Sequence, residues 1–116
     1  MEICVLISHG VAGSPEENWL PWLAAELKAL GHQVVVPRYP TPEGQSLTSW
    51  KGVLEQHFGS AGLDGQAALV GHSLGSVFHL RLLEQATKPV KASFFVSSFL
   101  RKLDIPEFDA LNKTFM

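Results

Sequence analysis

The chain has 116 residues, 46% of them hydrophobic and 17% charged, which is typical of one globular domain and excludes a disordered or fibrous chain. Its net charge of −2 gives no electrostatic reason to expect nucleic acid or an anionic membrane as a partner. The one cysteine, Cys4, cannot form an intrachain disulfide, and the apolar run from Ile3 to Ile7 is too short for a signal peptide or a membrane span, so we expect a single cytoplasmic domain over residues 1–116.

Strands and helices alternate along the first part of the chain. An apolar run predicts a first strand over 2–8, followed by a loop. Ser14 and the Pro and Glu residues after it have the pattern of a helix start, although Pro21 interrupts it, so the main helix begins at one of these two places. The apolar face of this helix should consist of Trp22, Leu23, Leu27 and Leu30. Valine-rich residues 33–36 predict the second strand.

The same alternation continues to residue 100. Prolines exclude a helix over residues 37–44, which should form a rigid loop. The further elements predicted are a helix over 46–58, a glycine-rich connection over 59–65, a strand over 66–70, a helix over 74–86, a strand over 92–96, and a tail with a short helix over 108–113.

This alternation predicts an α/β fold: a parallel sheet with helices on both faces, in three layers. If the second and third strands flank the first, the direction of winding reverses between the first and third strands, where such sheets bind ligands. The loop after the first strand, His9-Gly10-Val11, and the turn at Ser73 would then meet at this crevice.

Residues 71–75 read Gly-His-Ser-Leu-Gly between an apolar strand and an apolar helix. A serine that attacks carbonyl groups must stand clear of the backbone, and a sharp strand-to-helix turn places it there. Such a turn predicts a positive φ at Ser73, and it brings chain segments so close that Gly71 and Gly75 are needed where a Cβ would clash. The alternative is an ordinary turn in which Ser73 only caps the helix.

Several motifs together resemble the α/β-hydrolase fold, and more narrowly the small serine hydrolases of the retinoblastoma-binding protein nine and YdeN family. The resemblance covers residues 2–100. It rests on Ser8-His9-Gly10 with Gly13, on Trp19 and Trp22, on the proline-spaced loop 37–42 ahead of Trp50, and on residues 71–76.

The resemblance implies a role for each matching residue. Ser73 would be the nucleophile, forming an acyl-enzyme with an ester, thioester or amide. The backbone N–H groups of Leu74 and Val11 would form the oxyanion hole and should face one cavity beside Ser73. The residues that shape the site would be His9, Gly10, Gly71, His72 and Gly75. The expected partner is a small acyl substrate, with no cofactor and no metal.

The family pattern also includes an acid and a histidine on loops after later strands. Here the sequence reaches Met116 shortly after its fourth strand, and none of the histidines at 9, 32, 57, 72 and 79 suits the role of base. Asp104 and Asp109 are more typical of solvated loop charges. We therefore expect the N-terminal part of a serine hydrolase, inactive or very weak alone, with self-association through an exposed strand edge at 94–96.

Two other classes remain open. The chain could be a binding or interaction protein that keeps the hydrolase scaffold without its chemistry. It could also be a phosphate- or nucleotide-binding domain of similar topology, although the glycines after the first strand fit neither the P-loop nor the dinucleotide pattern.

Overall fold

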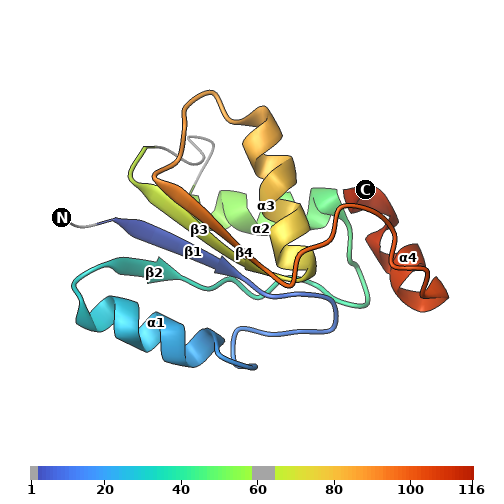
Figure 1. Ribbon diagram of the computed structural model, residues 1–116, viewed down its shortest axis with the longest axis horizontal. Helices are drawn as coiled ribbons and strands as arrows, with labels where there is room; N and C mark the ends of the chain where they lie inside the picture. The colour runs from blue at the N-terminus through green and yellow to red at the C-terminus, as the bar shows by residue number, and fades with distance from the viewer. Residues whose placement is uncertain (1–2, 59–64) are drawn as a thin grey trace.

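Four strands form one parallel sheet in the order β2–β1–β3–β4 (Figure 1). The computed structural model describes residues 3–58 and 65–116. The strands are β1 (Cys4–Ser8), β2 (Gln33–Val35), β3 (Ala67–His72) and β4 (Ala92–Val96). Because β1 pairs with both β2 and β3, the direction of winding reverses between β1 and β3, as the sequence predicts. The start of the predicted first strand and most of the predicted glycine-rich connection lie outside the described residues.

Helices cover both faces of this sheet, which confirms the three-layer α/β architecture (Figure 1). The helices are α1 (Leu20–Ala29), α2 (Leu47–Phe58), α3 (Leu74–Gln85) and α4 (Pro106–Asn112), and a 3₁₀ turn, η2, covers Lys113–Phe115. Figure 1 shows α1 on one side of the sheet and α2 and α3 on the other. Within the described residues, no helix has the length and apolar character needed to cross a membrane.

The side chains of β1 alternate between two hydrophobic cores. Leu6 packs into the core that α2 and α3 cover, whereas Val5 and Ile7 pack into the core beneath α1. This alternation follows from the period of two residues in a strand, and because both faces are covered, β1 is apolar at successive residues up to Ile7. Trp50 and Phe78 lie at the centre of the first core and are fully buried there.

Local signals explain where the helices begin and end. The Ser46 hydroxyl accepts a hydrogen bond from the N–H of Ser49 and so caps α2. At the end of α1, Gly31 has a φ of +95°, and the N–H of His32 donates to the carbonyl oxygen of Leu27. The N–H of Gly31 donates to Lys28, so the helix ends in the paired bonds of a Schellman motif.

The structure decides between the two expected starts of α1 and corrects its expected apolar face. The helix begins at Leu20, next to Pro21, and not at Ser14, whose hydroxyl and carbonyl groups accept hydrogen bonds from the N–H groups of Glu16 and Glu17 in a turn. Trp22 and Leu30 are exposed rather than part of the apolar face, at 64% and 73%. The face that packs on the sheet consists of Leu20, Leu23, Ala24 and Leu27. These residues follow the helical spacing i, i+3, i+4, i+7, which places Trp22 away from that stripe. Leu30 follows the last residue of the helix.

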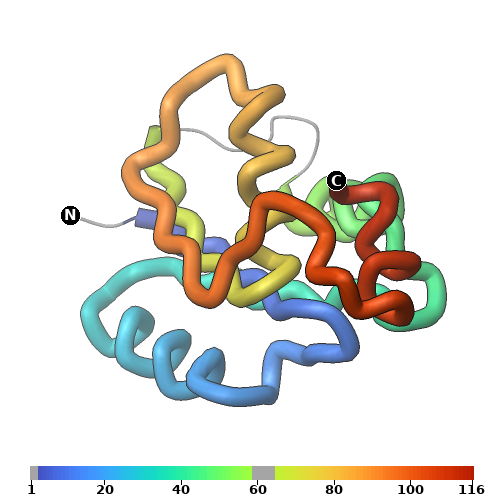
Figure 2. Tube along the Cα trace, turned by 45° about the vertical axis from the view of Figure 1, so that its right-hand side comes forward, coloured from blue at the N-terminus to red at the C-terminus, as the bar shows by residue number. Residues whose placement is uncertain are grey.

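The C-terminal segment packs against the start of α2 rather than trailing as a loop (Figure 2). The side-chain amide of Gln45 donates to the carbonyl oxygen of Leu111 and to the Asn112 side chain, at 2.7 and 3.0 Å. Phe115 is buried, with its ring centroid 5.0 Å from that of Trp50. The predicted short helix in the tail is present as α4, which begins two residues earlier than expected.

Candidate active site

Ser73 lies at the turn between β3 and α3. Its φ is +56° and its ψ is −119°, a conformation that a residue with a Cβ rarely adopts. The predicted positive φ at Ser73 is therefore confirmed. Ser73 also serves as the N-cap of α3 but makes no side-chain capping hydrogen bond, so capping does not account for its hydroxyl. A serine in a strained backbone conformation, with a hydroxyl that does not cap the helix, fits the geometry of a nucleophile elbow.

The two glycines of the motif allow the turn to close. A Cβ built on Gly71 would lie 2.6 Å from the backbone N and Cα of Ser76. A Cβ on Gly75 would overlap the backbone carbonyl of Ser8 and lie 2.7 Å from the carbonyl oxygen of His9. Gly71 thus lets β3 approach α3, and Gly75 lets α3 approach the end of β1.

The loop after β1 reaches the serine, as the topology predicts. A Cβ built on Gly10 would lie 3.0 Å from the Cβ of Ser73 and 3.5 Å from its hydroxyl oxygen. Val11 follows directly and packs against the core shared with α3. Leu74 is the first residue of α3, so its N–H has no acceptor within the helix. The Gly10 contact brings the loop that carries the Val11 amide beside the turn that carries the Leu74 amide.

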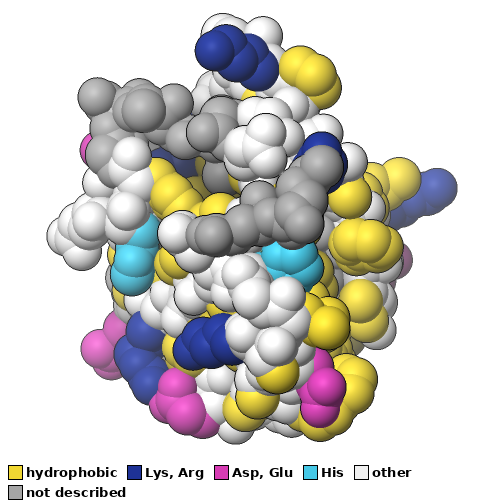
Figure 3. Space-filling view, turned by 90° about the vertical axis from the view of Figure 1, so that its left-hand side faces the viewer, with side chains coloured by type: hydrophobic (Ala, Val, Ile, Leu, Met, Phe, Trp, Pro, Cys, Tyr) yellow, Lys and Arg dark blue, Asp and Glu magenta, His cyan; other side chains and the backbone are white. Residues whose placement is uncertain are grey.

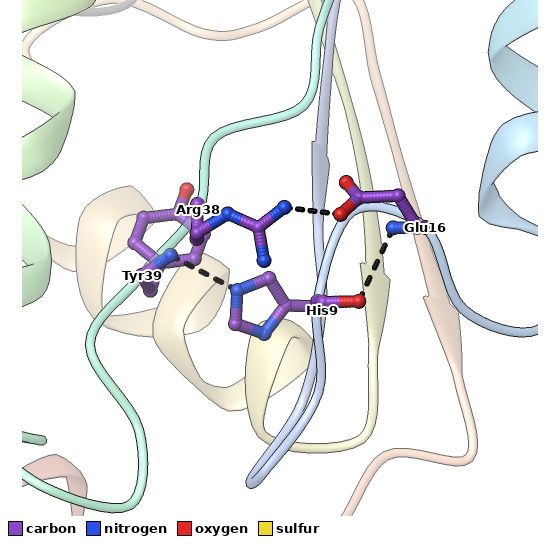
Figure 4. Close-up of polar contacts among 5 residues, drawn as sticks. His9, Glu16, Arg38 and Tyr39 are labelled. Atoms are coloured by element: carbon purple, nitrogen blue, oxygen red, sulfur yellow. Dashed lines mark hydrogen bonds and ion pairs between the residues drawn. The ribbon is translucent and has the colours of Figure 1, made fainter.

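His9 is fully buried and holds this loop against the segment after β2 (Figure 4). Its Nε2 accepts a hydrogen bond from the backbone N–H of Tyr39 at 3.0 Å. Its Nδ1 lies 2.9 Å from the carbonyl oxygen of Gly10, so Nδ1 carries the proton and donates to it. Burial lowers the pKa of His9 below 6.5. With both ring nitrogens occupied, His9 has no nitrogen free to take a proton from Ser73.

The other histidines also lie in places that do not make them a base for Ser73. The ring of His72 packs edge-on against Trp19, with centroids 5.6 Å apart. His32 accepts a hydrogen bond from the N–H of Ile3, and His57 lies in the last turn of α2. Across residues 3–58 and 65–116, no histidine forms a hydrogen bond with Ser73, and no cluster of His, Cys, Asp and Glu could hold a metal ion.

Two aspartates of the C-terminal segment, Asp104 and Asp109, are candidates for the acid. The carboxylate of Asp109 accepts a hydrogen bond from the N–H of Leu103 at 2.8 Å, which closes a turn ahead of α4. Asp104 is exposed and has a φ of +62°. Asp64, at the amino end of β3, lies outside the described residues.

One buried polar chain near the site was missed by the sequence analysis. The Nε2 of His79 lies 2.8 Å from the hydroxyl of Ser8, which lies 2.8 Å from the hydroxyl of Tyr39. His79 and Ser8 are fully buried. The only sequence signal for this pair is that each is a polar residue at a core position, one in an apolar strand and one in an apolar helix face.

A model of the serine hydrolase family matches residues 5–114 of the chain. The chain belongs to the serine hydrolase family. The resemblance found from the sequence motifs is thereby confirmed at the level of the family.

Relatives of this serine hydrolase chain agree in sequence and in fold. YdeN of Bacillus subtilis (strain 168) is 36% identical over 103 residues, which cover 85% of this chain and 52% of YdeN. The crystal structure of the ydeN gene product superposes with a TM-score of 0.75 at 32% identity, over 98% of this chain and 60% of that one. This serine hydrolase chain therefore spans about half the length of the YdeN sequence.

More distant structures share the fold alone. Polyneuridine aldehyde esterase has a TM-score of 0.69 at 18% identity, over 97% of this chain and 48% of the esterase. An extracellular α/β-hydrolase from a Paenibacillus species has a TM-score of 0.67 at 20% identity, over 86% of this chain and 42% of that one. The sheet of this serine hydrolase chain is therefore part of an α/β-hydrolase sheet.

Proposed function

We propose that this chain carries the nucleophile of a serine hydrolase that cleaves a carboxylic ester, thioester or amide through an acyl-enzyme on Ser73. The observation that supports the proposal most strongly is the positive φ of Ser73 between two glycines that no other residue could replace. In this mechanism the Ser73 hydroxyl oxygen attacks the carbonyl carbon, the bond from that carbon to the leaving oxygen, sulfur or nitrogen breaks, and the hydroxyl proton passes to the leaving group. Water then hydrolyses the acyl-serine ester to the carboxylic acid and restores the Ser73 hydroxyl.

We further propose that the N–H groups of Val11 and Leu74 stabilise the oxyanion that forms during both steps. Two observations support these donors: Gly10 packs against Ser73, and Leu74 is the first residue of α3. The positive end of the α3 dipole lies at the same point and favours the developing negative charge. His9, Gly10, Gly71, His72 and Gly75 would shape the site without taking part in bond making.

The proposed reaction needs a base, and we propose that residues 1–116 alone react slowly because no described histidine is placed to serve. Ser73 and the two amides could still give a rate about 10³ to 10⁴ times that in water. The substrate would be a small acyl compound, and the single cysteine favours a reducing compartment such as the cytoplasm.

A second function is favoured by one observation: among the described residues, no histidine forms a hydrogen bond with Ser73. In this alternative the chain binds a partner on a hydrolase scaffold and performs no chemistry. A strained serine costs folding energy that a binding protein has no reason to keep, so we favour the hydrolase.

The experiment that separates the two functions is covalent labelling with an excess of a fluorophosphonate, followed by peptide mapping. We expect one slow adduct on Ser73, absent from Ser73→Ala and unchanged in Ser98→Ala, a variant of an exposed serine two residues after β4. No adduct at all, or an equal adduct on Ser98, would favour the binding protein.

A further inference from the structure

His79, Ser8 and Tyr39 form a buried polar chain between three segments that surround the site. His79 lies in α3, Ser8 ends β1, and Tyr39 follows β2. The two contacts are each 2.8 Å long, and the relative exposure of these side chains is 0% for His79 and Ser8 and 2% for Tyr39. Burying polar groups this completely costs folding free energy unless they form hydrogen bonds, so this buried polar chain needs a physical explanation.

The direction of the hydrogen bonds can be worked out by counting donors. Ser8 and Tyr39 each have one O–H, and neutral His79 has one N–H, but only two contacts are present to use these hydrogens. If Nε2 of His79 carried the hydrogen, one hydroxyl hydrogen and the Nδ1 lone pair would both lack a partner. If Nδ1 carries it, only that N–H lacks a partner, and Nδ1 indeed makes no hydrogen bond with any described residue.

The second arrangement is therefore favoured. Tyr39 donates to Ser8, and Ser8 donates to Nε2 of His79. The buried position also lowers the pKa of His79 to about 3, which keeps the ring neutral and leaves Nε2 able to accept.

Tyr39 holds two consecutive residues, the last residue of β1 and the first residue of the loop after it. Its hydroxyl donates to Ser8, and its backbone N–H donates to Nε2 of His9 at 3.0 Å. His9 in turn donates to the carbonyl oxygen of Gly10, which also accepts from the N–H of Gly13 at 3.1 Å. The polar chain thus continues without a break from α3 to the loop that carries the Val11 amide.

We propose that Ser8, Tyr39 and His79 are positioning residues that fix the loop after β1 relative to the start of α3. The inference rests on the proposed function, because these two segments carry the proposed oxyanion donors. The backbone of Ser8 adds to the same junction, since its carbonyl packs directly against Gly75. Oxyanion donors that are held in place before the substrate binds need no rearrangement during the reaction. The buried polar chain would benefit catalysis in this way.

The test is amide hydrogen exchange of the 116-residue protein and of its variant His79→Leu. This variant removes the Nε2 acceptor of the Ser8 hydroxyl and places an apolar side chain of similar size in the core. We expect the Tyr39 and Gly13 amides to exchange about fivefold faster, the effect of losing one hydrogen bond. The amides of β1 and β3 should be unchanged. His79→Gln, which can still accept from Ser8, should restore slow exchange at both positions.

The readout does not depend on hydrolysis, so failure of the proposed function leaves it interpretable. Equal acceleration at every amide would mean that His79 only stabilises the fold. No change at Tyr39 or Gly13 would mean that the hydrogen bonds between His79, Ser8 and Tyr39 do not hold the loop in place. Either result would overturn the proposal. If His79→Leu does not fold, Tyr39→Phe removes the hydroxyl alone and should speed exchange at Gly13. The imidazole ¹⁵N spectrum of the unmodified chain gives a further test: His79 protonated on Nε2 would also overturn the proposal.

Discussion

The backbone N–H of Ser73 donates a hydrogen bond to the carbonyl oxygen of Val96, 2.9 Å away. The proposed nucleophile is therefore held by β4, the strand at the edge of the sheet in the described residues. On its other side, the loop after β1 packs against the same serine through Gly10. The geometry of the turn thus depends on the two strands that flank β3, and not only on the motif that contains it.

The turn should not tolerate a side chain at Gly75. Gly75→Ala should lower the free energy of unfolding by about 3 kcal/mol or more, because the added Cβ would overlap the carbonyl of Ser8. Gly52→Ala is the matched control: Gly52 lies within α2 and a Cβ there would meet nothing within 4 Å. That variant should gain about 0.5 to 1 kcal/mol, as measured by urea denaturation. Equal stability of the two variants would contradict the close approach of α3 to β1.

Acid should destabilise the fold through His79. The pKa of this buried ring is lowered from 6.5 to about 3, so below pH 6.5 the unfolded chain binds a proton that the folded chain does not. Above pH 6.5 the His79 ring is neutral in both the folded and the unfolded chain, so it does not lower the free energy of unfolding. Below pH 6.5 the free energy of unfolding falls by about 1.4 kcal/mol per pH unit as the pH decreases towards 3. His9, whose pKa is also lowered by burial, acts in the same direction.

Urea denaturation at a series of pH values, with and without His79→Leu, measures this effect. We expect the free energy of unfolding to fall less steeply with decreasing pH in His79→Leu, which lacks the contribution of His79 to this pH dependence and keeps that of His9. The same decline in both proteins would show that His79 is protonated as easily in the folded as in the unfolded chain.

The edge strand should favour self-association. Phe94, Phe95 and Val96 in β4 are exposed at 58%, 41% and 37%. Figure 3 shows one face of the molecule, where exposed hydrophobic side chains gather mainly along the right-hand side. Phe94→Lys should weaken association about tenfold or more, the loss expected when one phenylalanine is no longer buried. Sedimentation velocity over a range of concentrations measures this.

The matched control is Trp22→Lys, which removes an aromatic side chain of similar exposure, 64%, from α1. It should leave the association constant unchanged, because α1 packs on the face of the sheet and does not cover the edge at β4. A protein that is monomeric at all concentrations, or one that associates through Trp22, would contradict the prediction.

The sequence predicted the elements whose local and tertiary signals agree. The prediction of a strand at residues 92–96 agrees with β4, and the turn at Ser73 follows from Gly71 and Gly75, which its geometry requires. Of the two expected starts of α1, the one at Ser14 is wrong because a short turn has the same capping pattern. In this turn Ser14 accepts hydrogen bonds from the N–H groups of Glu16 and Glu17. Asn18, with a φ of +56°, lies in the next turn, in which the N–H of Leu20 donates to the carbonyl oxygen of Glu17 as α1 begins.

The polar chain could not be predicted from the sequence. His79 and Ser8 are 71 residues apart in the sequence, and His79 lies between two apolar residues, so nothing local indicates that the two side chains meet. Trp22 and Leu30 are large and apolar, which predicts them on the buried face of α1. The helical period excludes Trp22 from that face, whereas Leu30 keeps the spacing from Leu23 and Leu27 but follows the last residue of the helix.

The hydrolysis of a p-nitrophenyl ester by the 116-residue protein, beside Ser73→Ala and Ser98→Ala, tests the central claim most directly. We predict slow release of p-nitrophenol that is lost in Ser73→Ala and kept in Ser98→Ala, because Ser73 attacks without a well-placed base. Release that is the same in Ser73→Ala would contradict the assignment of the nucleophile. Fast turnover that depends on Ser73 would instead show that a base is present in this chain and that our account of its histidines is wrong.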